Sequence, residues 1–502
     1  MSISRRSRVV SAAAAAVIAV PCLAASIPAH AVDKRVSGAM PSVRLIGTQD
    51  HVTVKQGRRG GLYIQPSVYI AAVRGAFEIW AQRPSYHEPL AVSQVRRRDG
   101  VVEQVESKPG IVLDDMNNGL TDFMRLTFTN KKGEVIRDRT FNFCANSYQG
   151  QRVNDNGPTN PTYPEICNTN PFTLGMVWGI DKGWAVQFGH YIHVNKLLPE
   201  GAYQLKVSIT KLYRDQFSVA AEDSSAATNV DVVTRHRGTR AATRDRAAAA
   251  ATSQTSLTPA RGVVPGIDAL PDVAALPAWG INVDNRNNGK SFVRFGATVW
   301  NKGPSPLVVE GFREDNTETM KAFQYFYRDG DLVGRAFSGR LEYDHADGHE
   351  HWHFRDFANY SLLNADKTQA VRSGKEAFCL APTDIIDLTV AGAAMRPWLE
   401  GLGTACGDIE SLWIREVLQT GWGDTYAQYR PGQSFDITDL PNGKYFVEVR
   451  ANPDGRLYEV TDNNNVALRK IFIKGPAGDR RVVVPPYQLI DTENGSNCGF
   501  FC

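Results

Sequence analysis

Four of the ten histidines in this chain fall within nine residues: His345, His349, His351 and His353. If the segment is a β-strand, the last three side chains share one face, because successive side chains alternate between the two faces of a strand. Three imidazoles at this spacing can converge on one ion where the strand bends or twists. Imidazole ligands suit copper, zinc, nickel or iron, and the order of affinities favours Cu(II). We therefore predict a copper site with ligands His349, His351 and His353, and with His345 as a fourth ligand or as a partner of one of them.

Other classes of histidine metal site fit the sequence less well. The His-Glu-x-x-His pattern of helical zinc proteases is absent. A cupin-type site also places His-x-His on a β-strand, but it expects a glutamate a few residues later, and residues 354–359 contain none. A copper-binding protein without oxidase activity, serving metal handling or adhesion, is the remaining alternative.

The residues around and after the histidines resemble the lysyl oxidase family. That family carries a His-x-His-x-His copper motif, then Lys followed by Phe-Cys-Leu, then Asp-Thr-Tyr, and then Asp-Ile-Thr-Asp before a Pro-x-Gly-x-Tyr strand. This chain has the same order at 349–353, 375–380, 424–426, 436–439 and 441–445. The resemblance covers roughly residues 265–475 and does not extend to the N-terminal part.

The resemblance implies a copper-dependent amine oxidase with a lysine tyrosylquinone cofactor. By motif, the cross-linked residues would be Lys375 and Tyr426. Such an enzyme converts a primary amine to an aldehyde and releases hydrogen peroxide and ammonia, the cofactor carrying the difficult chemistry. The substrate would be a small primary amine or a protein lysine. Asp424 fits an exposed turn better than a general base, so the base stays unassigned.

The resemblance also implies a calcium site near the C-terminus. Its residues would be Asp272, Glu459, Asp462, Asn464 and Asn465. Oxygen-rich side chains suit a hard cation. The family's aspartate falls on Thr461, one place from Asp462, and a β-turn rich in Asn and Asp is the alternative explanation.

The elements that must hold these residues are β-strands. Residues 40–218 and 263–502 show two-residue alternation and β-branched or aromatic enrichment, interrupted by Gly, Asn, Asp and Pro clusters. We predict an all-β fold of two β-sandwich-like domains, of which the second is catalytic and binds copper. Residues 219–262 are rich in Ala, Thr, Ser and Arg, and we expect an exposed linker there.

The two halves share a short pattern. Residues 198–203 read Leu-Pro-Glu-Gly-Ala-Tyr, and residues 440–445 read Leu-Pro-Asn-Gly-Lys-Tyr. In both, Pro-x-Gly predicts a turn and the tyrosine begins an alternating strand. Two sandwiches of related design would explain the echo, and a common turn is the alternative. The N-terminal domain could hold a partner, a glycan or a prodomain surface.

The N-terminal 31 residues have the features of a secretory signal: three arginines, an alanine-rich apolar run, and Ala29 and Ala31 at the cleavage site. We expect a secreted protein without a membrane anchor, exported by the Sec or the twin-arginine route. The 502-residue chain has 56 basic and 53 acidic residues, and removal of the signal takes away three of the basic ones. A nearly neutral mature chain argues against a nucleic-acid partner.

The cysteine count fits an exported protein. Of the seven cysteines, one lies in the predicted signal, so six remain. An even number suggests disulfides. By proximity along the chain, we expect the pairs Cys144–Cys167, Cys379–Cys406 and Cys498–Cys502.

Overall fold

The computed structural model describes residues 39–493, apart from 58–60, 112, 114–115, 149, 168, 235–261, 314–316, 346–349, 356, 374–376 and 399–400. The predicted signal, most of the predicted linker and the Cys498–Cys502 pair lie outside these residues. The predicted all-β fold is confirmed, since the helical elements of the described chain are α1 (Lys211–Gln216) and the 3-10 turn η1 (Ile267–Ala269). Within the described residues, no helix has the length and apolar character needed to cross a membrane.

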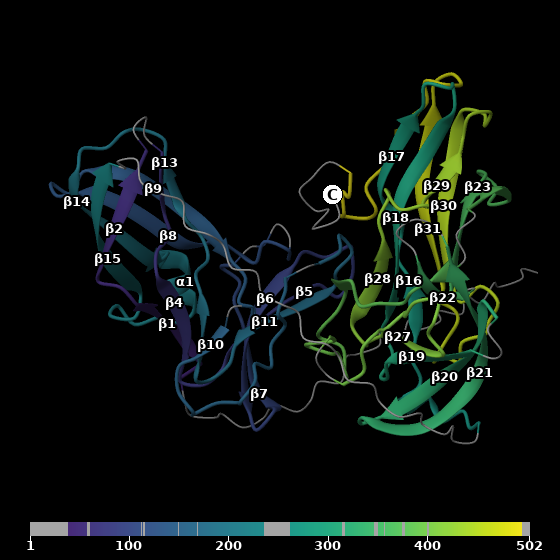
Figure 1. Cartoon of the computed structure of the whole chain (residues 1–502), viewed down its shortest axis with the longest axis horizontal. Coiled ribbons are helices and arrows are strands. Elements are labelled where there is room, and N and C mark those ends of the chain that lie inside the picture. Colours follow the sequence, from purple (N-terminus) through teal and green to yellow (C-terminus); the bar gives the residue numbers. More distant parts are fainter. Residues whose placement is uncertain are drawn as a thin grey trace, which may run out of the picture. The chain divides into compact units, whose positions relative to one another are not determined.

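Residues 39–234 form the N-terminal part, whose described strands make four sheets (Figure 1). Neighbouring strands run antiparallel except β15 and β2. The sheets, in strand order, are β1 (Ser42–Gly47), β4 (Val68–Val73), β12 (Trp184–Gln187), β10 (Gly150–Arg152); β11 (Gly175–Ile180), β5 (Phe77–Gln82), β6 (Ala91–Arg98), β7 (Val101–Ser107); β13 (Ile192–Val194), β3 (Leu62–Ile64); and β2 (His51–Gln56), β15 (Ser225–Thr234), β14 (Gly201–Ile209), β8 (Leu120–Asn130), β9 (Val135–Phe143).

Residues 262–493 form the C-terminal part, whose described strands make three sheets. The first is β16 (Val273–Ala275), β18 (Ser291–Asn301), β28 (Trp422–Tyr426), β26 (Asp384–Ile385), with β17 (Trp279–Asn285) and β29 (Ser434–Asp436) also on β18. The second is β25 (Ala377–Phe378), β22 (His351–Arg355), β21 (Asp331–Asp344), β20 (Thr319–Arg328), β19 (Leu307–Arg313), β27 (Trp413–Leu418). The third is β24 (Gln369–Arg372), β23 (Ala358–Leu363), β30 (Gly443–Ala451), β31 (Val466–Lys474), β32 (Arg481–Val483).

Residues 225–234 fall in the predicted linker, but they form a strand. Strand β15 covers residues 225–234 and pairs along its length with β14, so these residues belong to the N-terminal part. Its alternation of small and β-branched residues, with Val230 and Val232 fully buried, is a strand pattern within a polar composition. Residues 235–261 lie outside the described chain.

The repeated Leu-Pro-x-Gly-x-Tyr pattern gives the same local structure twice. Strands β14 and β30 both begin at the glycine of the pattern. The hydroxyl of Tyr203 donates to the carbonyl of Pro199 at 2.8 Å, and that of Tyr445 donates to the carbonyl of Pro441 at 2.8 Å. A tyrosine that bonds back across the corner fixes the entry into a sandwich strand. Both strands then bury every second residue, which forms the core of each part.

Candidate metal centre

Two of the predicted copper ligands meet on strand β22. The Nε2 atoms of His351 and His353 lie 2.9 Å apart, and the two rings are nearly perpendicular with centroids 4.6 Å apart. Trp352 points to the other face, where it is buried and donates to the carbonyl of Asp408. Side chains two apart on a strand are spaced by roughly 6–7 Å, so the rings have turned toward each other. Since a metal–imidazole bond is about 2 Å long, both nitrogens can bind one ion.

A carboxylate stands behind one of these histidines. His353 is almost fully buried, and its Nδ1 atom lies 3.5 Å from a carboxylate oxygen of Asp344, the last residue of β21. A histidine that binds metal through one ring nitrogen is commonly oriented by a carboxylate at the other. Sequence reasoning missed Asp344. The signal was available, since an acidic residue that ends the preceding strand falls opposite the histidines in an antiparallel pair.

His345, the fourth residue of the predicted site, is placed differently. His345 is exposed, and its Nε2 atom lies 3.1 Å from a carboxylate oxygen of Glu318. His349 lies outside the described residues. Within the described chain, no three or more His, Cys, Asp or Glu side chains gather into a group that could hold a metal. The structure therefore supplies two converging imidazoles, and their donor chemistry fits a copper ion that takes further ligands.

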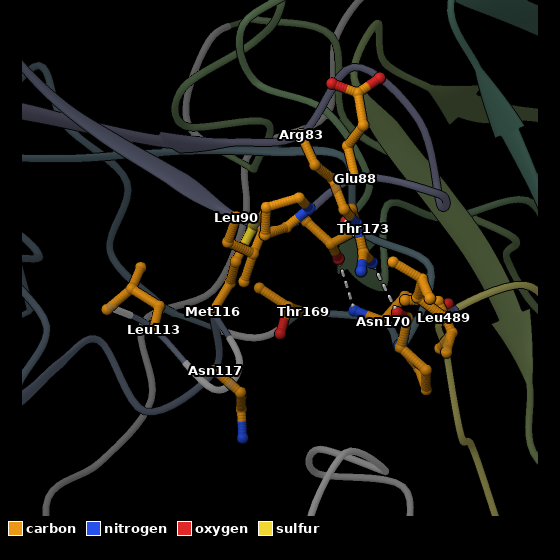
Figure 2. A pocket seen from close by; sticks show the side chains of 13 residues that line it. Arg83, Glu88, Leu90, Leu113, Met116, Asn117, Thr169, Asn170, Thr173 and Leu489 are labelled. Atoms are coloured by element: carbon orange, nitrogen blue, oxygen red, sulfur yellow. Dashed lines mark hydrogen bonds between the residues drawn. The ribbon is translucent and has the colours of Figure 1, made fainter. Parts of the chain in front are cut away.

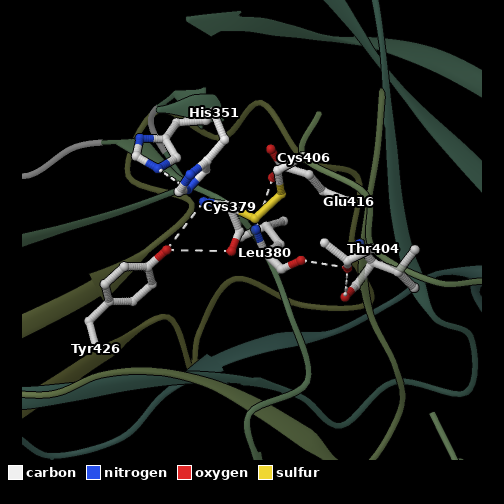
Figure 3. The surroundings of a disulfide bond; sticks show 9 residues. His351, Cys379, Leu380, Thr404, Cys406, Glu416 and Tyr426 are labelled. Atoms are coloured by element: carbon white, nitrogen blue, oxygen red, sulfur yellow. Dashed lines mark hydrogen bonds between the residues drawn. A yellow bond between two sulfur atoms is a disulfide. The ribbon is translucent and has the colours of Figure 1, made fainter. Parts of the chain in front are cut away.

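Tyr426, the predicted cofactor tyrosine, lies close to the strand that carries the histidines. Tyr426 ends β28, and its hydroxyl accepts a hydrogen bond from the backbone N–H of Cys379 at 3.2 Å (Figure 3). Strand β25 pairs antiparallel with β22, and Phe378 lies opposite Phe354. One residue further in this register, Cys379 lies opposite His353. Lys375, the predicted cross-linking partner, lies outside the described residues.

Two disulfides hold the chain as predicted from proximity. Cys379 is bonded to Cys406, and Cys144 is bonded to Cys167. The first of these fixes the backbone on which the Tyr426 hydroxyl rests (Figure 3). The aromatic ring of Phe378 then meets the Tyr426 ring edge to face, with centroids 4.9 Å apart. The tyrosine is thus held at its hydroxyl and at its ring.

Two buried carboxyl groups face the tyrosine. Asp424 is not an exposed turn residue, as we expected, but is buried on β28 and shares a face with Tyr426. The turn ends earlier, at Gly421, whose φ of +88° suits glycine, so Asp424 pairs in mid-sheet with Val299. Burial and then the negative charges of Asp424 and Glu416 hold the pKa of Tyr426 well above its usual range.

Glu416 is the second of these carboxyl groups. It is fully buried on β27, and one carboxylate oxygen accepts a hydrogen bond from the backbone N–H of Leu380 at 3.0 Å. Burial raises the pKa of Glu416 well above its usual range, and the negative charge of Asp424 adds to the increase. Tyr426 and Glu416 both have raised pKa values, so both groups hold their protons tightly.

A buried polar network lies on the opposite face of β28. The hydroxyl of Thr425 donates to the carboxylate of Asp384 at 2.8 Å and lies 2.6 Å from the hydroxyl of Thr298. The side-chain amide of Asn170 donates to both Thr298, at 2.8 Å, and Asp384, at 2.9 Å. Asn170 belongs to the N-terminal part, so that part bonds to β18 and β26, the two strands that pair with β28. Sequence reasoning had no signal for this contact, because 214 residues separate Asn170 from Asp384.

The loop that carries Asn170 is held by a half-buried arginine. The guanidinium of Arg83 donates to the carbonyls of Pro171 and Thr173 at 2.8–3.0 Å (Figure 2). A cavity of about 200 Å³ lies beside this loop, with Leu489 and Ile490 of the C-terminal segment among its lining residues. Because the N–H groups of Arg83 donate to backbone carbonyls, its guanidinium holds this loop in place.

The predicted calcium residues form a second polar cluster. One oxygen of Glu459 accepts from the amides of Asn452 and Asn465 at 2.6 and 2.7 Å, and the amide of Asn464 donates to Asp272 at 3.0 Å. The side-chain carbonyl oxygens of Asn464 and Asn465 are buried without a hydrogen-bond partner among the described residues. Two carboxylates and two unpartnered carbonyls fit a hard cation.

The remaining members of the cluster differ from expectation in detail. Asp462 is exposed, and its backbone carbonyl accepts from the N–H of Asn465 at 3.4 Å. Asn452, which sequence reasoning missed, is buried and donates to Glu459. Its φ of +42° is a backbone conformation that asparagine tolerates better than most residues.

Fold and site together define an all-β protein with a candidate histidine metal centre next to a held tyrosine. The lysyl oxidase family model matches residues 330–479, so the resemblance of the C-terminal part to that family is confirmed. The match begins later than the expected residue 265 and leaves Asp272 outside it.

Two relatives show the extent of the similarity. Lysyl oxidase homolog 2 of Gallus gallus is 26% identical over 161 residues, which are 32% of this chain and 18% of that protein. Protein-lysine 6-oxidase of Rattus norvegicus is 31% identical over 129 residues, which are 25% of this chain and 28% of that protein. The chain thus spans less than a third of the length of each of these relatives.

Proposed function

We propose that this chain is a secreted, copper-dependent amine oxidase of the lysyl oxidase type. The observation that carries the proposal is the convergence of His351 and His353 at 2.9 Å, beside the backbone on which the Tyr426 hydroxyl rests. Both features fall inside the region that matches the lysyl oxidase family model. Separately, either feature could be structural, but an oxidase of this type needs both.

The metal and the cofactor would be held by residues of the motif. His349, His351 and His353 would hold copper, with Asp344 orienting His353. Lys375 and Tyr426 would form the quinone, which supplies the electrophilic carbonyl for a substrate amine and returns its electrons to O₂. In the whole reaction, a primary amine, O₂ and water give an aldehyde, hydrogen peroxide and ammonia.

The residues of the chain would position the reacting atoms and move the protons. The N–H of Cys379 holds the tyrosine oxygen, and the Phe378 ring fixes its plane. Asp424, buried on the same face of β28, would accept the proton from the carbon that bears the amine. A negative charge at this position also favours a substrate that arrives as a cation.

The substrate would be a primary amine, and a lysine side chain of a protein is the best-supported example. The printed name of one relative, protein-lysine 6-oxidase, supports this choice. We also propose a calcium ion at Asp272, Glu459, Asn464 and Asn465, with Asp462 at its edge. Such an ion would fix the start of β16 to the turn before β31.

The decisive experiment combines a chemical and a catalytic measurement. The purified chain is incubated with copper in air and digested, and its peptides are examined by mass spectrometry. We expect a peptide in which Lys375 and Tyr426 are joined, and hydrogen peroxide release when a primary amine is added. Both signals should be lost in Lys375→Ala and Tyr426→Phe, while copper stays bound.

The matched control is Tyr429→Phe, because Tyr429 is exposed and lies three residues after Tyr426. This variant should cross-link and release peroxide like the parent. Uncrosslinked peptides from fully copper-loaded protein would contradict the oxidase proposal and favour a copper-binding protein without oxidase activity.

A further inference from the structure

A pocket in the N-terminal part has no role in the proposed oxidase chemistry. It has a volume of about 350 Å³ and is formed by the chain before β8, the end of β9 and the end of β12. The polar and aromatic side chains at its wall include those of Asn117, Asn142, Tyr148, Gln187, Phe188 and His190. A concave site with convergent polar groups is the usual place for a small ligand.

The wall of this pocket carries no formal charge. Its described lining residues include no Asp, Glu, Lys or Arg. Burial lowers the pKa of His190, so this imidazole is neutral at neutral pH. Recognition of an anionic group relies on Arg or Lys, and a hard cation needs carboxylates. The chemistry of the wall therefore selects an uncharged ligand.

The polar groups of the wall can both donate and accept. A side-chain amide offers two donors and one acceptor oxygen, and a tyrosine hydroxyl offers both functions. The side chains of Asn117, Gln187 and Tyr148 form no hydrogen bond with other described residues. A ligand that presents many hydroxyl groups matches these unused donors and acceptors.

Aromatic rings also line the pocket. The ring of His190 packs on Phe141 and Phe188, with centroids 4.9 and 5.1 Å apart. Tyr148 is 66% exposed, so its ring face is open to a ligand. Flat rings next to hydroxyl-matching amides suit a sugar ring, which has an apolar C–H face and a polar rim.

The pocket is held in shape before any ligand arrives. The Cys144–Cys167 disulfide fixes one side of it. The Asn142 side-chain carbonyl accepts from the N–H of Asp122 at 3.0 Å, and that of Asn146 accepts from the N–H of Tyr148 at 3.1 Å. Preorganisation of this kind lowers the entropy cost of binding.

A second aromatic surface follows directly in the chain. On the two-stranded antiparallel sheet of β3 and β13, the rings of Tyr63 and His193 are stacked with centroids 4.1 Å apart and planes 7° apart. The ring centroid of Tyr191, the residue after His190, lies 5.6 Å from that of Tyr63. Tyr63 and Tyr191 are 62% and 56% exposed, and exposed aromatic groups of this size commonly mark a binding surface.

We propose that the pocket lined by Asn117, Tyr148, Gln187 and His190 binds a neutral saccharide unit of an uncharged polysaccharide or glycan. The Tyr63–Tyr191–His193 surface would contact further sugar units of the same chain. Binding there would keep the C-terminal part close to a glycan-bearing surface. The inference does not depend on the proposed oxidase function.

The test is affinity electrophoresis of the full chain in native gels that contain soluble β-glucan, galactomannan or glycol chitin, with anionic polygalacturonate as the comparison. We expect at least one neutral polymer to retard the protein, and its oligosaccharide to compete. Gln187→Ala and Tyr148→Ala should each weaken this binding about tenfold, since each removes hydrogen bonds or a stacking face. Tyr429→Ala, an exposed tyrosine of the C-terminal part, should leave it unchanged.

Three results would overturn the proposal: no retardation by any neutral polymer, retardation by polygalacturonate alone, or equal retardation of the parent and both pocket variants. Both positions lie at the protein surface or its edge, so the variants should fold, and unchanged circular dichroism verifies this. Unchanged amine-dependent peroxide release would separate the glycan site from the proposed oxidase site.

Discussion

The Nε2 atoms of His351 and His353 lie 2.9 Å apart, while the Nδ1 atom of His353 faces Asp344 at 3.5 Å. This arrangement leaves two imidazole nitrogens aimed at one point and a carboxylate behind one of them. We expect His351→Ala or His353→Ala to weaken copper binding by about a hundredfold or more, and Asp344→Asn to weaken it by about tenfold. Competition against a chelating dye measures the copper affinity of each variant.

His193→Ala is the control for this series, because His193 stacks on Tyr63 in the N-terminal part. Its copper affinity should equal that of the parent. If His351→Ala and His353→Ala retain parental affinity, the ion is bound elsewhere, and the assignment of the site to β22 fails.

Asp424→Asn tests the proposed proton acceptor. The substitution keeps the size of a side chain that is buried on the same face of β28 as Tyr426. Loss of a general base lowers turnover by roughly 10²–10⁴-fold. We expect a fall of this size in amine-dependent peroxide release, while the quinone absorbance persists and deuterium at the reacting carbon slows the reaction further. Asp436→Asn, at a half-exposed carboxylate, is the control, and parental turnover in Asp424→Asn would move the role to another group.

Asn170→Ala tests the hydrogen bonds between the N-terminal part and β18 and β26, the strands that pair with the strand of Tyr426. The substitution removes three buried hydrogen bonds: the side-chain amide donates to Thr298 and to Asp384, and the side-chain carbonyl accepts from the N–H of Phe172. Leaving buried partners unsatisfied costs about 1–3 kcal/mol, so the free energy of unfolding should fall by that amount in a denaturant titration. Asn156→Ala, at an exposed position, should change it little. An unchanged midpoint in Asn170→Ala would mean that water replaces the amide.

Patterns that repeat within a few residues were readable from the sequence. The alternation in residues 203–209 placed Tyr203, Leu205 and Val207 in the core, and the shared Pro-x-Gly-x-Tyr pattern gave two equivalent strand entries. The two disulfides within the described chain join cysteines that are neighbours in sequence order. Each of these features depends on local periodicity, which a sequence displays directly.

Long-range pairing was not readable in the same way. Asn170 reaches Asp384 across 214 residues, and no local pattern near either residue indicates the contact. Asp424, directly after Gly423, looked like a turn residue, but sheet pairing with Val299 buries it. Burial by a distant strand overrides local composition, because the sheet supplies the hydrogen bonds that a turn would otherwise leave to water.

Calcium should stabilise the protein through the cluster at Glu459. A ligand that binds only the folded state raises stability by RT ln(1 + [L]/Kd). We expect millimolar calcium to raise the Tm of the parent, and Glu459→Gln to abolish the increase, because two carboxylates and two unpartnered carbonyls face the site. Glu222→Gln, at an exposed position, should keep the full increase. An equal response in both variants would place calcium elsewhere.

Glu416 should make the stability of the metal-free protein fall as pH rises. Burial holds the pKa of the folded Glu416 well above its usual value of 4.5, so between these two pKa values the folded state binds more protons than the unfolded state. The free energy of unfolding therefore decreases with rising pH from about pH 4.5 upward. In Glu416→Gln the side chain is neutral at every pH, so the stability of this variant relative to the parent should increase between about pH 5 and pH 8. Denaturant titrations across that range measure the difference, with Glu222→Gln as the control whose curve stays parallel to that of the parent. Parallel curves for Glu416→Gln as well would show that the folded and unfolded states hold this proton equally, and that the carboxyl group is ionised beside Asp424 at neutral pH.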